Sequence, residues 1–204
     1  MITLNELQHD TLTEIINIGM GSAAAAMSIM VRDEVNISVP DISFSSIDTI
    51  QDNLSGLDTN ELASVRQGFD GELMGDAMLL FQGDKSLEIV RLLLSNTMTI
   101  DNNDFSDFEQ EALSEIGNII LNAGLSAIAN TLKFTVNSSL PIYKQGNLNK
   151  LMAPSDQTQT VLILRVDLSL ETKQIKGYVI YLMDIQSIDL LIEHIDRYIN
   201  SIPS

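Results

Sequence analysis

The sequence DTLTEIIN at residues 10–17 is followed by twenty-two residues and then Pro40, and this arrangement occurs twice in the chain. The second copy, EALSEIGN at residues 111–118, is likewise followed by twenty-two residues and Pro141. The glutamates, the asparagines and the prolines of the two copies each lie 101 residues apart. A spacing that is kept over three residue types predicts an internal duplication of the fold.

The polar residues of the first copy fall on one face of a helix. Residues three or four positions apart are neighbours on a helix surface, roughly 5–6 Å apart at Cβ, so Asp10, Glu14 and Asn17 form one polar stripe. The stripe offers a fixed anion, and an amide that both donates and accepts hydrogen bonds. It offers no nucleophile and no complete metal site, so we expect no metal ion here.

The ordinary explanation of such a stripe is the solvent-exposed face of an amphipathic helix. An exposed face, however, requires no particular pair of side chains. This chain keeps Glu14 and Asn17 as Glu115 and Asn118 in its second half, although most of the neighbouring residues differ. The repetition, together with the attached proline, therefore favours a functional site in each half.

At these residues the chain resembles the CheC/CheX/FliY family of bacterial chemotaxis phosphatases. The family pattern is Asp or Ser, three residues, Glu, two residues, Asn, twenty-two residues and Pro, and CheC members carry it twice. Asp10 and Pro40 complete the pattern in the first copy. In the second copy Glu111 stands where the family has Asp or Ser, and Pro141 closes the motif. The resemblance covers essentially the whole chain.

The resemblance implies a phosphatase acting on a phosphorylated CheY-type response regulator, whose receiver domain carries an aspartyl phosphate and its own Mg²⁺. It implies that Asn17 or Asn118 inserts beside the acyl phosphate and holds the attacking water. It also implies that Glu14 or Glu115 pairs with the lysine of the receiver's active site. The protein itself would then need no cofactor.

Three further readings concern partners. A non-catalytic adaptor, which binds a response regulator or a flagellar-switch component without turnover, would use the same helix faces. In CheC proteins that bind the deamidase CheD, an amphipathic helix follows the second proline, whereas residues 142–160 here are polar without a helical stripe; we therefore do not expect CheD binding. We expect a monomer, since two halves in one chain can satisfy their sheet edges internally, although dimerisation through an edge or a long helix stays open.

The composition excludes several classes of partner. With 28 acidic and 11 basic residues the formal charge is −17, which repels nucleic acid and anionic membranes and favours a partner with a basic patch. The absence of cysteine excludes disulfides and thiol chemistry. We expect a cytoplasmic protein, because the N-terminus does not read as a signal peptide. The longest apolar runs, near residues 23–31 and 161–166, are shorter than the ~20 residues of a membrane span.

The patterns predict an α+β fold: one domain, residues 1–204, made of repeat halves 1–98 and 99–204 related by a pseudo-two-fold axis. One antiparallel-rich sheet would be flanked by two long helices. The expected elements are helices over 3–31, 84–96, 106–132 and 184–199, strands over 35–47 and 136–140, and hairpins over 61–82 and 161–183.

Local signals add finer expectations. Thr3 with Glu6, and Ser106 with Glu109, form capping boxes that would begin the two long helices. Gly19 and Gly21 interrupt the first helix; they would serve close packing against the sheet or leave room for a partner's backbone beyond Asn17. Surface roles are expected for His9 and His194.

Overall fold

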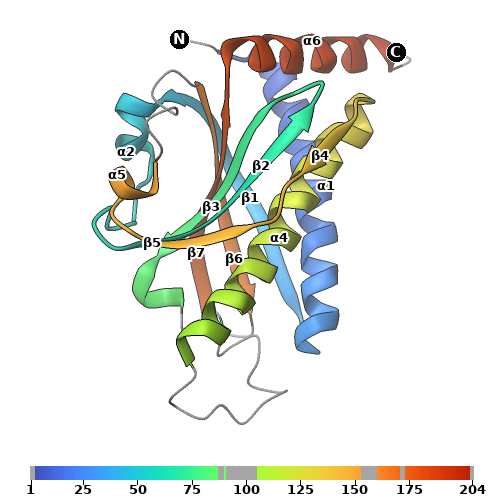
Figure 1. Ribbon diagram of the computed structural model, residues 1–204. Helices are drawn as coiled ribbons and strands as arrows, with labels where there is room; N and C mark the ends of the chain where they lie inside the picture. The colour runs from blue at the N-terminus through green and yellow to red at the C-terminus, as the bar shows by residue number, and fades with distance from the viewer. Residues whose placement is uncertain (1–2, 87–89, 91–104, 153–159, 171–172, 203–204) are drawn as a thin grey trace.

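The fold is of the α+β class, as expected: long helices lie on one face of a seven-stranded antiparallel sheet (Figure 1). The computed structural model describes residues 3–86, 90, 105–152, 160–170 and 173–202. Its helices are α1 (Glu6–Val31), η1 (Ile47–Thr49), α2 (Ile50–Asn53), η2 (Gly83–Lys85), α4 (Phe105–Leu132), α5 (Leu148–Leu151) and α6 (Ile185–Ser201). Its strands are β1 (Val35–Ser46), β2 (Leu62–Gly71), β3 (Gly75–Gln82), β4 (Val136–Ser138), β5 (Ile142–Gly146), β6 (Thr160–Leu170) and β7 (Lys173–Met183).

The order of the strands is symmetric. It runs β1-β6-β7-β3-β2-β4, and β5 also pairs with β2. A shift of 101 residues superimposes β1 on β4 and β5, β2 on β6, and β3 on β7. The first strand of each half therefore pairs with the hairpin of the other half, as the pseudo-two-fold arrangement requires.

This exchange of strands bears on the domain organisation. The hairpin β2–β3 is completed by β4 and β5, and the hairpin β6–β7 is completed by β1. Neither half can build its part of the sheet from its own residues alone. We propose that residues 1–98 and 99–204 fold as one cooperative domain.

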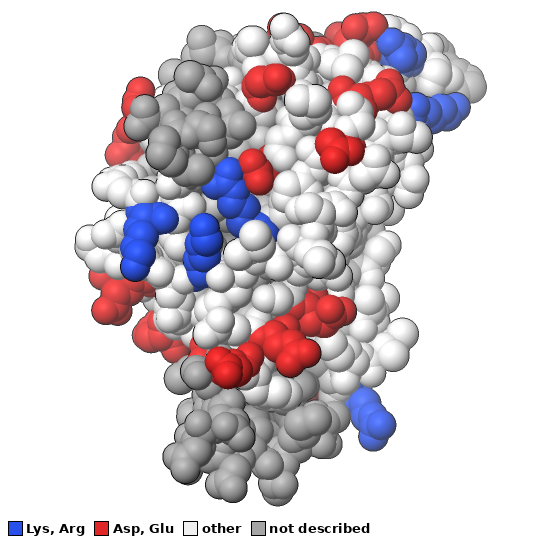
Figure 2. All heavy atoms as spheres, viewed as in Figure 1, with Lys and Arg blue, Asp and Glu red and all other residues white. Residues whose placement is uncertain are grey.

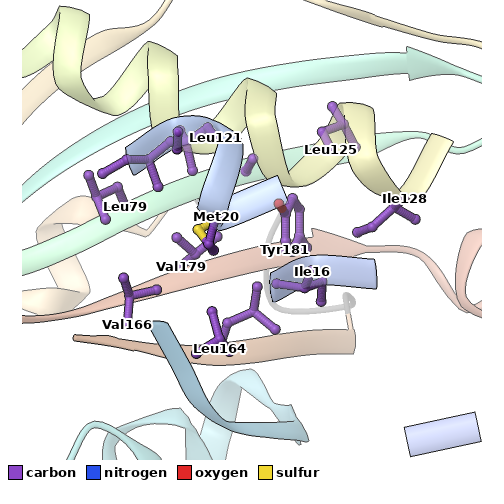
Figure 3. Close-up of a cluster of buried hydrophobic side chains, with 14 of the residues drawn as sticks. Ile16, Met20, Leu79, Leu121, Leu125, Ile128, Leu164, Val166, Val179 and Tyr181 are labelled. Carbon is purple, nitrogen blue, oxygen red and sulfur yellow. The ribbon is translucent and has the colours of Figure 1, made fainter. Parts of the chain in front are cut away.

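Two apolar cores hold the layers together, one on each face of the sheet. The larger core lies under α1, α4 and α6, and the smaller lies under α2 and α5. Figure 1 shows α1 and α4 crossing the same face of the sheet in opposite directions. Figure 3 shows the centre of the larger core, with Ile16, Met20, Leu79, Leu121, Leu125, Ile128, Leu164, Val166, Val179 and Tyr181. Each long helix thus buries one stripe and leaves the other to solvent.

Glycines allow α4 to approach its neighbours closely. A Cβ on Gly19 would lie 2.7 Å from the carbonyl oxygen of Ala123. This glycine therefore packs against α4, whereas packing against the sheet was expected. A Cβ on Gly117 would overlap the side chain of Val65 in β2. Gly21 is different, because a Cβ there would meet nothing within 4 Å.

The beginning of α1 differs from the sequence prediction. The capping box is formed by Asn5 and Gln8: Gln8 N donates to Asn5 Oδ1 (2.9 Å) and Asn5 N donates to Gln8 Oε1 (3.0 Å). The Thr3–Glu6 prediction was wrong because Asn5 satisfies the same geometry two residues later. The last helix is capped by Asp184, whose Oδ1 accepts from Ser187 N.

Some local predictions fall on residues that the structure does not describe. Within the predicted helix 84–96 only residues 84–86 and Val90 are described, and all four are helical. The side chain of Ser106 also lies outside the described residues, so its capping role stays a prediction.

The second histidine is a core residue, contrary to expectation. His194 is buried, its Nδ1 lies 3.2 Å from the carbonyl oxygen of Leu132, and its ring lies 5.3 Å from that of Phe134. The polar and apolar sides of an imidazole allow it to fill such a site at a helix end. The surface role predicted for His194 was therefore wrong.

Two features bear on the expectations about membranes and assembly. By length and composition α1 and α4 could each cross a membrane, which the apolar runs did not suggest, but 44% and 50% of their apolar windows are buried in the fold. Helices in the core of a folded protein have the same composition. The sheet is open, with β1 and β4 at its edges, so internal edge closure does not support the expected monomer; a bulge and short strands interrupt the edges instead.

A pair of glycine substitutions tests the packing of α4. We expect Gly117→Ala to lower the free energy of unfolding by about 1–3 kcal/mol, because the added methyl group overlaps Val65. Gly21→Ala should raise it by about 0.5–1 kcal/mol, because this helix position is open. Urea unfolding measures both, and equal stability of the two variants would contradict the packing described.

Candidate functional site

Asn17 joins helix α1 to the edge of the sheet. Its Nδ2 donates to the carbonyl oxygen of Thr13 (3.0 Å), and its Oδ1 accepts from the N–H of Val39 in β1 (3.2 Å). The carboxamide is half-buried and is held at both ends. Rotation of its plane would break one of these bonds, so the side chain presents a fixed orientation.

Pro40 lies at a break in the pairing of β1 with β6. The register shifts between Ser38 and Asp41, so Val39 and Pro40 occupy a β-bulge on an edge strand. Proline has no N–H to contribute to a ladder and is therefore tolerated there. Val39 immediately precedes it and donates to Asn17. The twenty-two residues between Asn17 and Pro40 thus complete α1 and bring the chain back along β1 to the bulge beside Asn17.

The carboxylates of the first stripe are exposed. Glu14 makes no hydrogen bond or ion pair with any described residue. Asp10, one turn earlier, is 73% exposed and lies 3.6 Å from His9 Nδ1. The apolar side chain of Ile18, beside Asn17, is 57% exposed. This part of α1 therefore combines an anion that has no partner within the described fold with an exposed apolar contact.

The second asparagine is held differently. Asn118 Oδ1 accepts from Asn122 Nδ2 (2.6 Å) and from Gln67 Nε2 (3.4 Å). Its carboxamide makes no hydrogen bond to Leu140, the residue before Pro141, in the part of the chain that is described. The second site thus replaces a backbone contact with two side-chain amides.

The link from the second site to the proline segment passes through Gln67. This residue of β2 is only 4% exposed, and its Nε2 donates to the carbonyl oxygen of Ser139 (2.7 Å). The pairing with β2 is interrupted between β4 and β5, where Pro141 lies. Both prolines therefore mark an interruption of an edge strand.

Exposed carboxylates accompany the second asparagine as they do the first. Glu111 and Glu115 are exposed on α4, and among the described residues neither forms an ion pair or a hydrogen bond. Leu140 is 85% exposed and Ile142 is 58% exposed, and both line the pocket that contains Arg66 and Lys144. Figure 2 shows acidic side chains gathered along the lower part of α4.

The two sites are separate. Asn17 contacts β1, whereas Asn118 contacts β2, four strands away in the sheet. At about 4.8 Å per strand the two contacts lie roughly 20 Å apart. The structure brings Glu, Asn and Pro together within each half, and it does not combine the two halves into one centre.

A basic pocket, which no sequence pattern predicted, lies on the opposite face of the sheet. The pocket has a volume of about 330 Å³ and is lined by Arg66, Lys144 and Lys150, together with Asp76, whose carboxylate accepts from Arg66 at 2.9 Å. Figure 2 shows these basic side chains as a group near the position of β5. The residues come from four elements, β2, β3, β5 and α5, which the pairing of β2 with β3 and β5 brings together.

The chemistry available at the two motifs is limited to orientation and electrostatics. Each site presents a carboxamide and an exposed carboxylate, and the hydroxyls of Thr13 and Ser114, one turn before the asparagines, donate to carbonyl oxygens of their own helices. Within the described ranges, no three acidic or histidine side chains gather as a metal site would require. Such a pair can hold a water or a cationic group of a partner, and the reactive group would have to come with the partner.

Comparison with known proteins points to one family. The model of the CheC-like family matches residues 7–44, which contain the first motif and Pro40. The CheY-P phosphatase CheC of Bacillus subtilis is 29% identical over 139 residues. That match covers 68% of this chain and 66% of the relative, slightly less than two thirds of its length. These similarities support the predicted resemblance to the CheC/CheX/FliY family.

Solved structures agree in fold. FliY of Thermotoga maritima matches with a TM-score of 0.74 at 20% identity, covering 97% of this chain and 100% of that one. The FliM middle domain of H. pylori matches at 0.64 and 13% identity, covering 94% and 99%. A chain of the CheX-CheY-BeF3-Mg complex of Borrelia burgdorferi matches at 0.52 and 19% identity, covering 84% and 99%. At these identities the likeness concerns the fold alone.

Hydrogen exchange tests the bond between Asn17 and β1. We expect Asn17→Ala to speed the exchange of the Val39 amide about fivefold, which corresponds to the loss of one hydrogen bond of about 1 kcal/mol. Asn118→Ala is the matched control at the second site, and the Leu140 amide should exchange at an unchanged rate. NMR-detected exchange measures both, and an unchanged Val39 rate would refute the bond.

Proposed function

We propose that this CheC-like chain is a phosphatase that hydrolyses the aspartyl phosphate of a CheY-type response regulator in bacterial chemotaxis. One observation carries the proposal: each half holds an asparagine carboxamide in a fixed orientation, one helical turn from an exposed glutamate without a partner in the described fold. Known relatives supply the substrate class, since CheC of Bacillus subtilis is a CheY-P phosphatase.

The reaction suits a site that lacks a nucleophile. Water attacks the phosphorus atom, the bond from phosphorus to the aspartyl oxygen breaks, and a carboxylate and inorganic phosphate are released. Phosphoryl transfer depends mainly on in-line placement and on charge stabilisation. The receiver domain brings the phosphoryl group and its own Mg²⁺. We propose that Asn17 and Asn118 each hold the attacking water in line.

The glutamates are proposed to set the docking of the receiver. Glu14 and Glu115 are exposed, and among the described residues they have no cationic partner. A lysine of the receiver's active site would gain a charge-assisted hydrogen bond with either carboxylate, which fixes orientation as well as affinity. Ile18 and Leu140 would add apolar contact beside the asparagines. Asp10 and Glu111 extend the acidic stripe one turn further and would support the docking.

The remaining expectations about partners stay proposals. A cytoplasmic location follows from a cytoplasmic substrate, and we propose that the chain acts as a monomer. We do not expect CheD binding: the described residues directly after Pro141, 142–152, form β5 and the four-residue helix α5. Neither element provides the long amphipathic helix that this partner would require.

The rival function is a non-catalytic adaptor. It is suggested by the similarity of the fold to FliM, including a FliM chain solved with FliG from H. pylori (TM-score 0.66, 12% identity, covering 93% of this chain and 100% of that one). An adaptor would bind a regulator or a flagellar-switch component through the same faces. Only the phosphatase requires the asparagines for turnover while docking survives their removal.

Phosphate release from a phosphorylated CheY-type receiver with Mg²⁺ tests the proposal. The wild type should accelerate release, each of Asn17→Ala and Asn118→Ala should retain the activity of the other site, and the double variant should lose about a hundredfold or more. Receiver binding should persist in the double variant. If the wild type adds nothing to the receiver's own hydrolysis over several regulators, the enzyme claim fails and binding alone supports the adaptor.

A further inference from the structure

The second site, around Asn118, includes a buried glutamine of β2 for which the fold itself has no need. Gln67 is 4% exposed, and its Oε1 is buried and accepts no hydrogen bond from any described residue. An unsatisfied buried polar atom costs about 1–3 kcal/mol. Such a cost is expected where the residue serves another purpose.

The first site shows what the fold alone requires at this place. Asp41 faces Arg165 across β1 and β6, and the residue 101 positions after Asp41 faces Arg66 across β2 and β5, so by strand register Arg66 corresponds to Arg165. The next residue along the strand is Val166 of β6 beside the first site and Gln67 of β2 beside the second. Val166 is 2% exposed and lies in the larger core. An apolar side chain therefore fills this position without cost.

A second difference lies one turn along the helix from each asparagine. Asn122 follows Asn118 by four residues, and Gly21 occupies the corresponding place after Asn17. A Cβ on Gly21 would meet nothing within 4 Å. The first asparagine thus has no amide neighbour at this place, while the second has Asn122 on α4 and Gln67 on β2.

Both extra amides contact the oxygen of Asn118. Asn122 Nδ2 donates to Asn118 Oδ1 at 2.6 Å, and Gln67 Nε2 lies 3.4 Å from both Asn118 Oδ1 and Asn122 Oδ1. Gln67 is itself anchored, because its Nε2 donates to the carbonyl oxygen of Ser139 at 2.7 Å. The oxygen end of the Asn118 carboxamide is therefore turned toward buried β2. Its Nδ2 end makes no hydrogen bond to a described residue.

We propose that Gln67 and Asn122 are positioning residues of the second site. They hold Asn118 Oδ1 inward so that both N–H groups of Nδ2 face the docked substrate. Asn17, in contrast, donates one N–H of Nδ2 to the carbonyl oxygen of Thr13. The two sites thus present their carboxamides in different ways. This inference rests on the proposed function for its kinetic consequence, but the orientation itself does not depend on it.

The kinetic test uses Gln67→Met in an Asn17→Ala background, where turnover has to come from the second site. Methionine nearly matches glutamine in shape but cannot donate a hydrogen bond. We expect kcat to fall about tenfold or more, because small misplacements of a reacting group are costly. KM should stay within about twofold, since Glu115 is untouched. Gln82→Met, the same change in β3 at a side chain that bonds to Asp58 and Glu61, is the control and should alter neither value.

The structural test needs no phosphorylated partner. The side-chain amide signals of Asn118 are identified in ¹⁵N–¹H NMR spectra by their loss in Asn118→Ala. Gln67→Met and Asn122→Gly should each shift these signals and increase the motion of the amide, and Gln82→Met should not. Asn122 lies on the helix surface, so Asn122→Gly carries the test if Gln67→Met fails to fold.

The outcomes separate this inference from the proposed function. Unchanged Asn118 amide signals in both variants would overturn it, and so would a raised KM with kcat unaltered, which would place Gln67 in docking. A wild type without turnover would remove the proposed function while the NMR result still decides the orientation. Shifted signals together with a loss confined to kcat would support both.

Discussion

The hydrogen bond between the Asn17 carboxamide and the Val39 N–H is the contact on which the first site depends. It joins the exposed face of a long helix to the bulge of an edge strand, and so fixes the orientation of a side chain that would otherwise rotate freely. The bulge exists because Pro40 cannot contribute an N–H to the ladder. The asparagine and the proline of the motif therefore act together, because the amide connects the helix to the interrupted strand.

The two halves have kept this unit and changed its attachments. In the second half the asparagine is held by side chains, and Gln67 makes the contact to the proline segment that Asn17 makes directly in the first. Strand exchange between the halves explains why such divergence is possible. Because β2 belongs to the first half but lies beside α4 of the second, a change in one repeat alters the site of the other.

The sequence predicted the features that depend on periodicity and spacing. Both long helices and both hairpins follow from local pattern, and the duplication predicted the symmetry of the sheet. The sequence did not predict the contact of Gln67 with Asn118, the Gly117–Val65 contact or the burial of His194, because each depends on residues brought together from distant segments. The Thr3–Glu6 cap failed for another reason: Asn5 competes for the same role two residues later. The candidate site residues were predicted from the repeated motif, whereas their hydrogen bonds come from the structure.

The central claim is that the asparagines face the phosphoryl group of a docked receiver. The most direct measurement is a crystal structure of this protein with a CheY-type receiver, Mg²⁺ and beryllofluoride. The account predicts Asn17 or Asn118 within hydrogen-bond distance, about 3 Å, of the beryllofluoride group or of a water in line with it. It also predicts Glu14 or Glu115 against the receiver's lysine. A receiver seated elsewhere, for example over the basic pocket of Arg66, Lys144 and Lys150, would contradict it.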